Sequence, residues 1–290
     1  MTLRDQGPLQ LWWRDAKVNV RRAERLWDHV RRPAAYPPPR YAFADGGFDK
    51  LHGWRTVTID RGDAAADPRL EAGKHANLQL AAPCFDGLVL GPDRPLSFWT
   101  ALGRVTAGRG FRYGMELRGG CLVPALGGGL CMLSNALFDL AAHLGWTVLE
   151  RHGHSKEAVP PPADQPWGLD ATVFWPHVDL RVAPRDEVRL ACRVGQGQLL
   201  VDVHGRAPAE VRCEIRACKD QTRVQAGVRQ RENELWRKTF ALADGRLLAD
   251  ELLVRNHKVL LHSWQQARNC LTCGEVGCHA RVRPAELVAG

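Results

Sequence analysis

The chain has 290 residues, of which 45% are hydrophobic and 25% charged, and its formal net charge is +8. This balance is typical of a globular protein with one large core or two modest ones. No stretch approaches the roughly 20 apolar residues of a membrane span, and the N-terminus lacks the apolar core of a signal peptide, so a cytoplasmic location is expected. In that reducing compartment, the nine cysteines indicate buried thiols, metal ligands or catalytic groups rather than disulfides.

Much of the positive charge lies near the start of the chain, in the predicted helix KVNVRRAERLWDHVRR. Its arginines alternate with the apolar residues Val20, Leu26, Trp27 and Val30. The simplest prediction is a solvated basic helix whose apolar face packs on the core. The alternative is peripheral contact with an anionic membrane, with Trp12, Trp13 and Trp27 at the interface. No recognised nucleic-acid motif accompanies the charge, so no nucleic-acid partner is expected.

The chain divides into four predicted segments. Residues 1–69 hold the basic helix, a proline-rich linker after RRPAAYPPPR and a weakly patterned stretch. Residues 70–185 begin with a helix that ends at a turn at Asp86-Gly87, and they form the predicted core. Residues 186–265 alternate as antiparallel strands, with a hairpin at Asp244-Gly245, and residues 266–290 are a cysteine-rich tail. The pattern predicts an α+β fold, in which a cysteine-bearing helix packs on strands.

The stretch GGGLCMLSNALFDLAAHLG, residues 127–145, predicts a helix whose leucines share one buried face. Cys131 falls in its first turn, where unpaired N–H groups and the helix dipole favour a thiolate. Gly127, Gly128 and Gly129 would let a substrate approach closely and leave N–H groups for an oxyanion. Ser134 and Asn135, one turn further on, are candidate substrate-binding residues. The alternative is a small core cysteine after a glycine-rich turn.

A thiolate nucleophile needs a base, and the base needs an orienting group. The stretch ERHGHS supplies His152 and His154 at the end of the next predicted strand, and either can serve as the base. Asp170 and Asp179, in the two following strand candidates, are the candidate orienting groups. The order cysteine, histidine, polar residue is that of papain-like thiol hydrolases, which is an analogy at the level of the fold. A rival interpretation is a metal site built on the two histidines.

Three stretches carry a resemblance to a known family: PLSFWTALGRVTAGRGFRYG, GGGLCMLSNALFDLAAHLGWTVLERHGHS and LDATVFWPHVDLRV. Together, over roughly residues 70–185, they closely resemble the VanW family. The family pattern has glutamine after the cysteine, where this chain has Met132. If that glutamine contributes to an oxyanion hole, the resemblance implies that this chain lacks one donor. It also implies a bacterial protein connected with cell-wall peptide or glycopeptide-resistance chemistry.

The tail sequence NCLTCGEVGCHAR has the spacing of a metal site. Cys270 and Cys273 form a C-x2-C pair, the usual first half of a zinc knuckle or an iron–sulfur loop, and Cys278 follows. A structural zinc ion is the first prediction, with an iron–sulfur cluster or metal-free thiols as alternatives. A fourth ligand would come from elsewhere, with Cys213, Cys218, His257 and His262 as the candidates.

Three functional hypotheses follow from these patterns. The first is a thiol-dependent hydrolase or acyl/amide transferase that uses Cys131 and His154 on a peptide or cell-wall-precursor-like substrate. The second is a non-catalytic accessory protein that binds a peptide or a partner and holds a structural metal. The third is a metal- or cluster-dependent enzyme in which the C-terminal cysteines do the chemistry.

Overall fold

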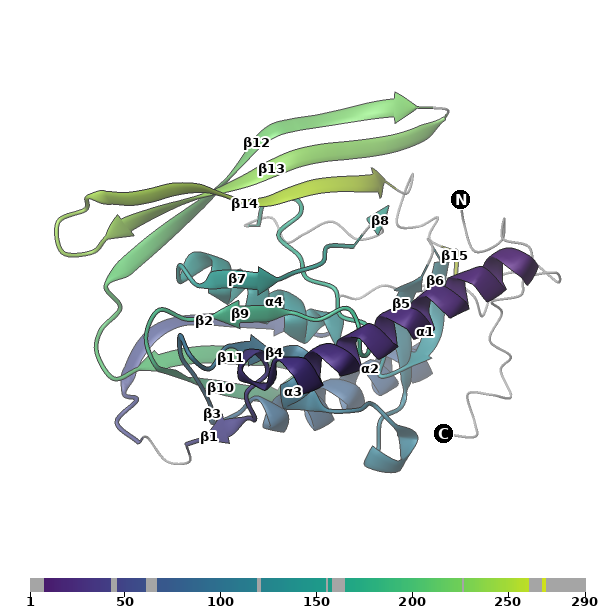
Figure 1. Ribbon diagram of the computed structural model, residues 1–290, viewed down its shortest axis with the longest axis horizontal. Helices are drawn as coiled ribbons and strands as arrows, with labels where there is room; N and C mark the ends of the chain where they lie inside the picture. The colour runs from purple at the N-terminus through teal and green to yellow at the C-terminus, as the bar shows by residue number, and fades with distance from the viewer. Residues whose placement is uncertain are drawn as a thin grey trace.

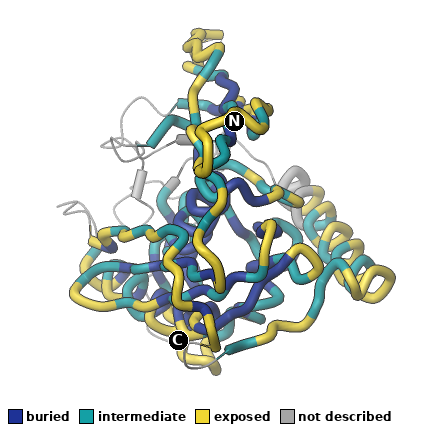
Figure 2. The backbone as a smooth tube through the Cα atoms, turned by 90° about the vertical axis from the view of Figure 1, so that its left-hand side faces the viewer, coloured by how far each residue is buried: buried dark blue, intermediate teal, exposed yellow. Residues whose placement is uncertain are grey.

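The computed structural model describes residues 8–42, 46–60, 67–118, 121–154, 156–157, 165–225, 227–260 and 268–269. In this part of the chain, α-helices and mainly antiparallel sheets combine, which confirms the predicted α+β class. A long, curved sheet lies above the rest in Figure 1, with helix α4 and a larger sheet below it. The buried backbone gathers in the centre of the lower body (Figure 2).

The central sheet is five-stranded and antiparallel, with the order β1-β3-β10-β11-β2. Its strands are β1 (Arg40–Tyr41), β2 (Lys50–Thr58), β3 (Leu88–Leu90), β10 (Val188–Gly195) and β11 (Gln198–Gly205). Alternate residues of β10 and β11, such as Leu190 and Val201, are fully buried, whereas their neighbours are half-exposed. The sheet takes strands from both sides of the predicted boundaries at residues 69 and 185.

Helix α4 (Cys131–His143) packs against β2 and β11 of this sheet. The leucine stripe predicted for it is buried, with Leu133, Leu137 and Leu140 each less than 5% exposed. Gly145 ends the helix in the left-handed conformation (φ +71°), and the N–H of Trp146 donates to the carbonyl of Ala141. The rest of the helix surface is also mostly buried, because a second sheet covers it.

That second sheet has the order β12-β13-β14-β8. Its strands are β12 (Val211–Gln225), β13 (Val228–Ala241), β14 (Leu247–Leu260) and the short parallel β8 (Lys156–Glu157). The predicted hairpin joins β13 and β14, although its connection covers residues 242–246 rather than two residues alone. Arg237 of β13 is buried and donates to the carbonyls of Ala142 and Trp146, so it caps the C-terminus of α4.

Two three-stranded sheets and two further helices complete the body. The first sheet is β4-β9-β7, and the second is β15-β6-β5. Their bounds are β4 (Leu96–Ser97), β5 (Tyr113–Arg118), β6 (Cys121–Leu126), β7 (Thr147–Glu150), β9 (Arg181–Ala183) and β15 (Arg268–Asn269). Helices α2 (Pro68–Ala81) and α3 (Phe98–Leu102) pack beside them. The core that joins these pieces contains aromatic side chains such as Phe85, Phe98 and Phe138.

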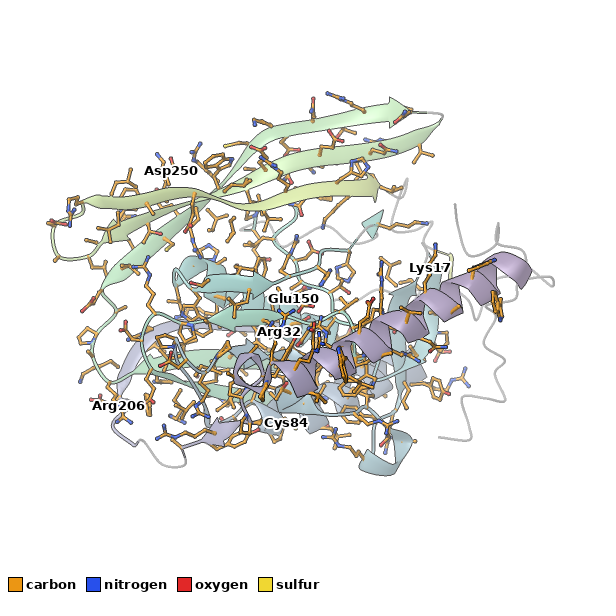
Figure 3. The ribbon with its side chains drawn as sticks, viewed as in Figure 1. Lys17, Arg32, Cys84, Glu150, Arg206 and Asp250 are labelled. Carbon is orange, nitrogen blue, oxygen red and sulfur yellow. The ribbon has the colours of Figure 1, made fainter. Side chains whose placement is uncertain are left out.

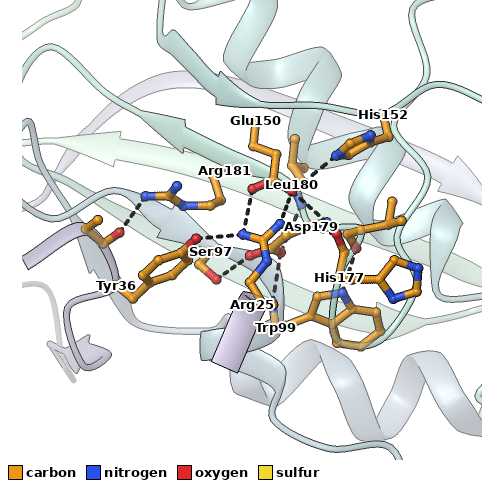
Figure 4. Close-up of polar contacts among 12 residues, drawn as sticks. Arg25, Tyr36, Ser97, Trp99, Glu150, His152, His177, Asp179, Leu180 and Arg181 are labelled. Atoms are coloured by element: carbon orange, nitrogen blue, oxygen red, sulfur yellow. Dashed lines mark hydrogen bonds and ion pairs between the residues drawn. The ribbon is translucent and has the colours of Figure 1, made fainter. Parts of the chain in front are cut away.

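Helix α1 (Pro8–Arg31) runs along the outside of the body (Figure 1). The prediction that its apolar face packs on the core is wrong, because Val20, Leu26, Trp27 and Val30 are each 57% to 73% exposed. The helix is held by a polar side chain instead. The guanidinium of Arg25 is 12% exposed and pairs with Glu150, 2.8 Å from its Oε2 (Figure 4). Among the described residues, no helix has the length and apolar composition to cross a membrane.

Candidate active site

Cys131 begins α4 directly after the three glycines. Gly127 and Gly129 have φ values of +78° and +100°, which L side chains rarely adopt. A Cβ on Gly128 would lie 2.4 Å from the carbonyl oxygen of Gly114, because two stretches of backbone cross there. The local fold therefore requires glycine at these positions, whether or not a substrate binds there.

The buried side chain of Asn77 fixes this crossing. Its amide donates to the carbonyls of Arg112 and Gly128, and its oxygen accepts from the N–H of Arg112. The N–H groups of Gly127 and Gly128 were expected to be free for an oxyanion. They donate to backbone carbonyls instead, so they are not available for that role. In the part of the chain described, the N–H of Cys131 has no hydrogen-bond acceptor, as is usual in the first turn of a helix.

The first turns of α4 hold the segment that follows Gly168. Ser134, which is fully buried, donates to the carbonyl of Ala171 at 2.6 Å. Asn135 accepts from the N–H of Ala171 at 2.7 Å. These bonds place Thr172 and Val173 beside the thiol. Sγ of Cys131 lies 3.6 Å from Oγ1 of Thr172 and 4.0 Å from the carbonyl oxygen of Val173. Ser134 and Asn135, expected to bind substrate, instead join the helix to this segment.

His154 is brought to the same place. Its Nδ1 lies 2.7 Å from Oδ2 of Asp170, which also accepts from the backbone N–H of His154 at 2.8 Å. The imidazole interacts with the thiol of Cys131 as well. The structure thus brings Cys131, His154 and Asp170 together, in the order that a nucleophile, a base and an orienting group require. The side chain of His154 is 26% exposed, so solvent reaches this group of residues.

Two further cations surround the carboxylate of Asp170. Nζ of Lys258, from β14, lies 2.6 Å from Oδ1, and Nη2 of Arg151 lies 3.0 Å from the same oxygen. Both side chains are less than 10% exposed. Arg151 also donates to the carbonyls of Gly168 and Asp170 and to the side chain of Asn256. The second sheet therefore supports the site from above, through Asn256 and Lys258 on one face of β14.

These surroundings decide the charges in the site. Burial works against the charged form of His154, but its hydrogen bonds to Asp170 and Cys131 raise the pKa of the imidazole to about 10. Burial likewise favours the neutral thiol, yet His154 outweighs it and lowers the pKa of Cys131. The pKa of Asp170 is also lowered against the effect of burial, by His154, Lys258 and Arg151. These shifts favour a thiolate beside an imidazolium ion, with an ionised carboxylate behind it, more than the same groups would in water.

The structure places His152 and Asp179 elsewhere. His152 is 47% exposed, and its Nε2 lies 3.2 Å from Glu150. Asp179 accepts from the hydroxyl of Ser97 at 2.6 Å and from two backbone N–H groups, at the start of α3 (Figure 4). Among the described contacts, neither side chain bonds to the thiol or to His154. Strand β7 ends at Glu150, and after it His152 and His154 reach different carboxylates.

The described residues hold no group of three or more His, Cys, Asp and Glu side chains that is arranged to bind a metal ion. His152 and His154 each contact a different carboxylate, so they do not form the rival metal site there. Cys270, Cys273 and Cys278 lie outside the described residues. Their zinc site stays a prediction, and metal analysis of protein purified without oxygen tests it. Absence of both zinc and iron would contradict the zinc and iron–sulfur interpretations.

Comparison with known proteins supports the resemblance seen in the motifs. Residues 73–204 match the family described as VanW like protein. The chain carries a VanW-like domain. The chain is 34% identical over 113 residues to the Vancomycin B-type resistance protein VanW of Enterococcus faecalis. This alignment covers 39% of this chain and 41% of that protein. The chain is also 32% identical over 107 residues to the uncharacterized protein YoaR of Bacillus subtilis, which covers 36% and 33%. No solved structure is significantly similar.

The VanW-like domain contains Cys131, His154 and Asp170, whereas Lys258 lies beyond its end at residue 204. The chain spans less than half the length of both relatives. Met132, which replaces the glutamine of the family pattern, packs against the hydrophobic core of the domain. Sequence reasoning missed Asn77, Arg151 and Lys258. Only Arg151 had a signal, since it stands directly before His152 in the stretch ERHGHS.

Proposed function

We propose that this VanW-like protein is a thiol-dependent hydrolase or acyl/amide transferase, with Cys131 as nucleophile, His154 as acid and base, and Asp170 as the orienting group. The observation that carries the proposal is the pairing of His154 with Asp170, a carboxylate that two buried cations also hold, next to a thiol whose pKa His154 lowers. A core cysteine that served packing alone would need no such partner. By contrast, burial raises the pKa of Cys192, another core thiol, to about 12.

The proposed reaction has two steps. The thiolate of Cys131 attacks a carbonyl carbon, and the unpartnered N–H of Cys131 at the start of α4 donates to the oxygen that becomes negative. His154 gives its proton to the leaving amine, the C–N bond breaks, and a thioester remains. Neutral His154 then takes a proton from water or from an acceptor amine. That nucleophile attacks the thioester, and the thiolate is released with a new acid or amide as product.

The substrate class proposed is a peptide or a cell-wall precursor with an amide bond. The name of the Enterococcus faecalis relative associates that protein with vancomycin resistance. The resemblance of this chain to the VanW family is what suggests a cell-wall substrate. The second hypothesis, an accessory protein that binds a peptide without reaction, uses the same surface around Cys131. The two differ in whether the thiol is reactive.

The test is the rate at which iodoacetamide labels Cys131, measured from pH 5 to pH 9 by mass spectrometry. We expect a midpoint well below about 8.5, the value of a free thiol. His154→Gln should raise that midpoint and slow labelling at pH 6 by about tenfold or more, since the imidazolium no longer stabilises the thiolate. His152→Gln, which alters a half-exposed side chain of the same segment, is the matched control and should leave the profile unchanged.

Cys213 provides an internal comparison in the same experiment. It is also partly buried beside a threonine hydroxyl, 3.4 Å from Oγ1 of Thr239, and no histidine is among its described hydrogen-bond partners. Cys131 should be labelled faster than Cys213 at pH 6. Equal rates for the two thiols would refute the proposal that Cys131 is a nucleophile and would favour the hypothesis of an accessory protein.

A further inference from the structure

The outward face of α1 is apolar, which is the reverse of a helix packed on a globular core. At about 100° per residue, Trp12, Trp13, Val20, Leu26, Trp27 and Val30 fall within an arc of about 140°. All six side chains are more than half exposed. In Figure 2, α1 forms the coil at the edge of the molecule, away from the buried centre. We define these six residues as the outer stripe of α1.

The opposite face of α1 contacts the body through polar groups. Arg25 lies between Glu150, the hydroxyl of Tyr36 at 2.6 Å and the carbonyl of His177 at 3.2 Å. His29 stacks on the ring of Tyr36, with centroids 4.0 Å apart. Because these contacts hold the helix from behind, the outer stripe stays exposed while α1 is docked. Exposure of the stripe therefore needs no rearrangement of the body.

Exposed basic side chains flank one edge of the outer stripe: at about 100° per residue, Arg31 falls on that edge and Lys17 about 40° beyond it. From Lys17 to Arg32 the chain has six lysine and arginine residues and two acidic residues; Arg25 is held against the body, and Nε of Arg22 is buried as well. Lys17, Arg21, Arg31 and Arg32 are exposed, and Arg31 lies over the ring of Trp27 at 4.9 Å. Figure 3 shows Lys17 beside the middle part of the helix and Arg32 at its C-terminal end. An occupant of this face must be apolar where it meets the stripe and negative around it.

We propose that the outer stripe of α1 binds the surface of an anionic lipid bilayer. Tryptophan and aliphatic side chains would enter the boundary between headgroups and acyl chains, and the lysine and arginines would contact acidic headgroups. A second copy of the chain fits less well, because a two-fold contact through this face would bring the arginines of two helices together. The inference does not depend on the chemistry proposed for Cys131.

The experiment is co-sedimentation of the full chain with vesicles of phosphatidylcholine, alone or mixed with phosphatidylglycerol. We expect binding to the mixed vesicles that weakens in high salt, together with a blue shift of tryptophan fluorescence. The double variant Leu26→Glu/Val30→Glu should reduce binding about tenfold or more, because both side chains are exposed and the change leaves the fold intact. Lys17→Glu/Arg21→Glu should reduce it as well, through the loss of charge attraction.

Trp54→Glu is the matched control, since Trp54 is 61% exposed but lies on β2, away from α1. It should bind as the unchanged protein does. Three outcomes would overturn the proposal: no binding to mixed vesicles, equal binding to both vesicle types, or equal loss with Trp54→Glu. Light scattering on the same protein samples detects the alternative occupant, a second copy of the chain. A dimer that Leu26→Glu/Val30→Glu dissociates, without vesicle binding, would assign the face to self-association.

Discussion

The site around Asp170 and the cluster around Asp179 both contain a largely buried carboxylate, but the two are charged differently. Asp170 is surrounded by Arg151, His154 and Lys258, and its pKa is lowered. Asp179 receives hydrogen bonds from neutral donors and lies near Glu150, and burial raises its pKa to about 6. Burial acts in the same direction on both groups, so the neighbours decide the outcome. Only the first carboxylate is suited to orient an imidazolium ion.

The largest expected effect is that of Asp170→Asn. It leaves the buried charges of Arg151 and Lys258 without their anion, which costs about 3–5 kcal/mol of unfolding free energy at pH 7. It also removes the partner of His154, so the pKa of Cys131 should rise and labelling at pH 6 should slow. Urea unfolding and iodoacetamide labelling measure the two effects. A variant as stable and as reactive as the unchanged protein would remove the distinction between the two carboxylates.

Asp179→Asn should change the unfolding free energy in a way that depends on pH and favours the variant at higher pH. The folded pKa of Asp179 lies above its unfolded value, about 3.9, so its contribution to stability is present below pH 4 and is lost as the pH rises through about 6. Asparagine does not titrate. From pH 4 to pH 7 the variant should therefore gain up to about 3 kcal/mol relative to the unchanged protein. Urea unfolding at four pH values measures this gain, and parallel stability curves would contradict it.

A smaller effect is expected for Lys258→Met, which keeps most of the aliphatic chain and removes one of the cations around Asp170. We expect a loss of about 1–3 kcal/mol in unfolding free energy and a modest rise in the labelling midpoint of Cys131. Lys219→Met is the matched control. It also breaks a lysine–carboxylate pair on the second sheet, but Lys219 is 71% exposed, so the loss should stay below about 1 kcal/mol. Equal losses would show that burial adds nothing to the Asp170 contact.

Local pattern predicted part of the group formed by Cys131, His154 and Asp170. Helix periodicity placed Cys131 in a first turn, and alternation placed both histidines near the end of β7. It did not distinguish His154 from His152, nor Asp170 from Asp179. That choice depends on where the chain turns after Glu150 and on the hydrogen bonds that Ala171 accepts from Ser134 and donates to Asn135. Lys258 was beyond reach, because a residue on a distant hairpin enters the site only through tertiary packing.

The helix α1 and the glycine run show a second limit. Periodicity groups Leu26, Trp27 and Val30 on one face, but it does not say which face meets the body. The ion pair of Arg25 with Glu150 decides that. Similarly, three glycines before a thiol favour a site for close approach, and the partner that approaches Gly128 is the chain's own backbone at Gly114. In both cases the pattern indicated a face or a close approach, but the partner first expected for it, the core for α1 and a substrate for the glycines, is not the one in the structure.

The ion pair between Lys258 and Asp170 has a consequence for dividing this protein. A fragment cut at residues 73 and 204, where the family match begins and ends, would keep Cys131, His154 and Asp170. It would lose Lys258 and Asn256 together with all of β13 and β14, and it would also lose β2 from the central sheet. Such a fragment would hold every residue of the proposed reaction and still lack the supports that set their charges. The structural unit that holds the proposed site is therefore larger than the stretch of sequence that matches the family model.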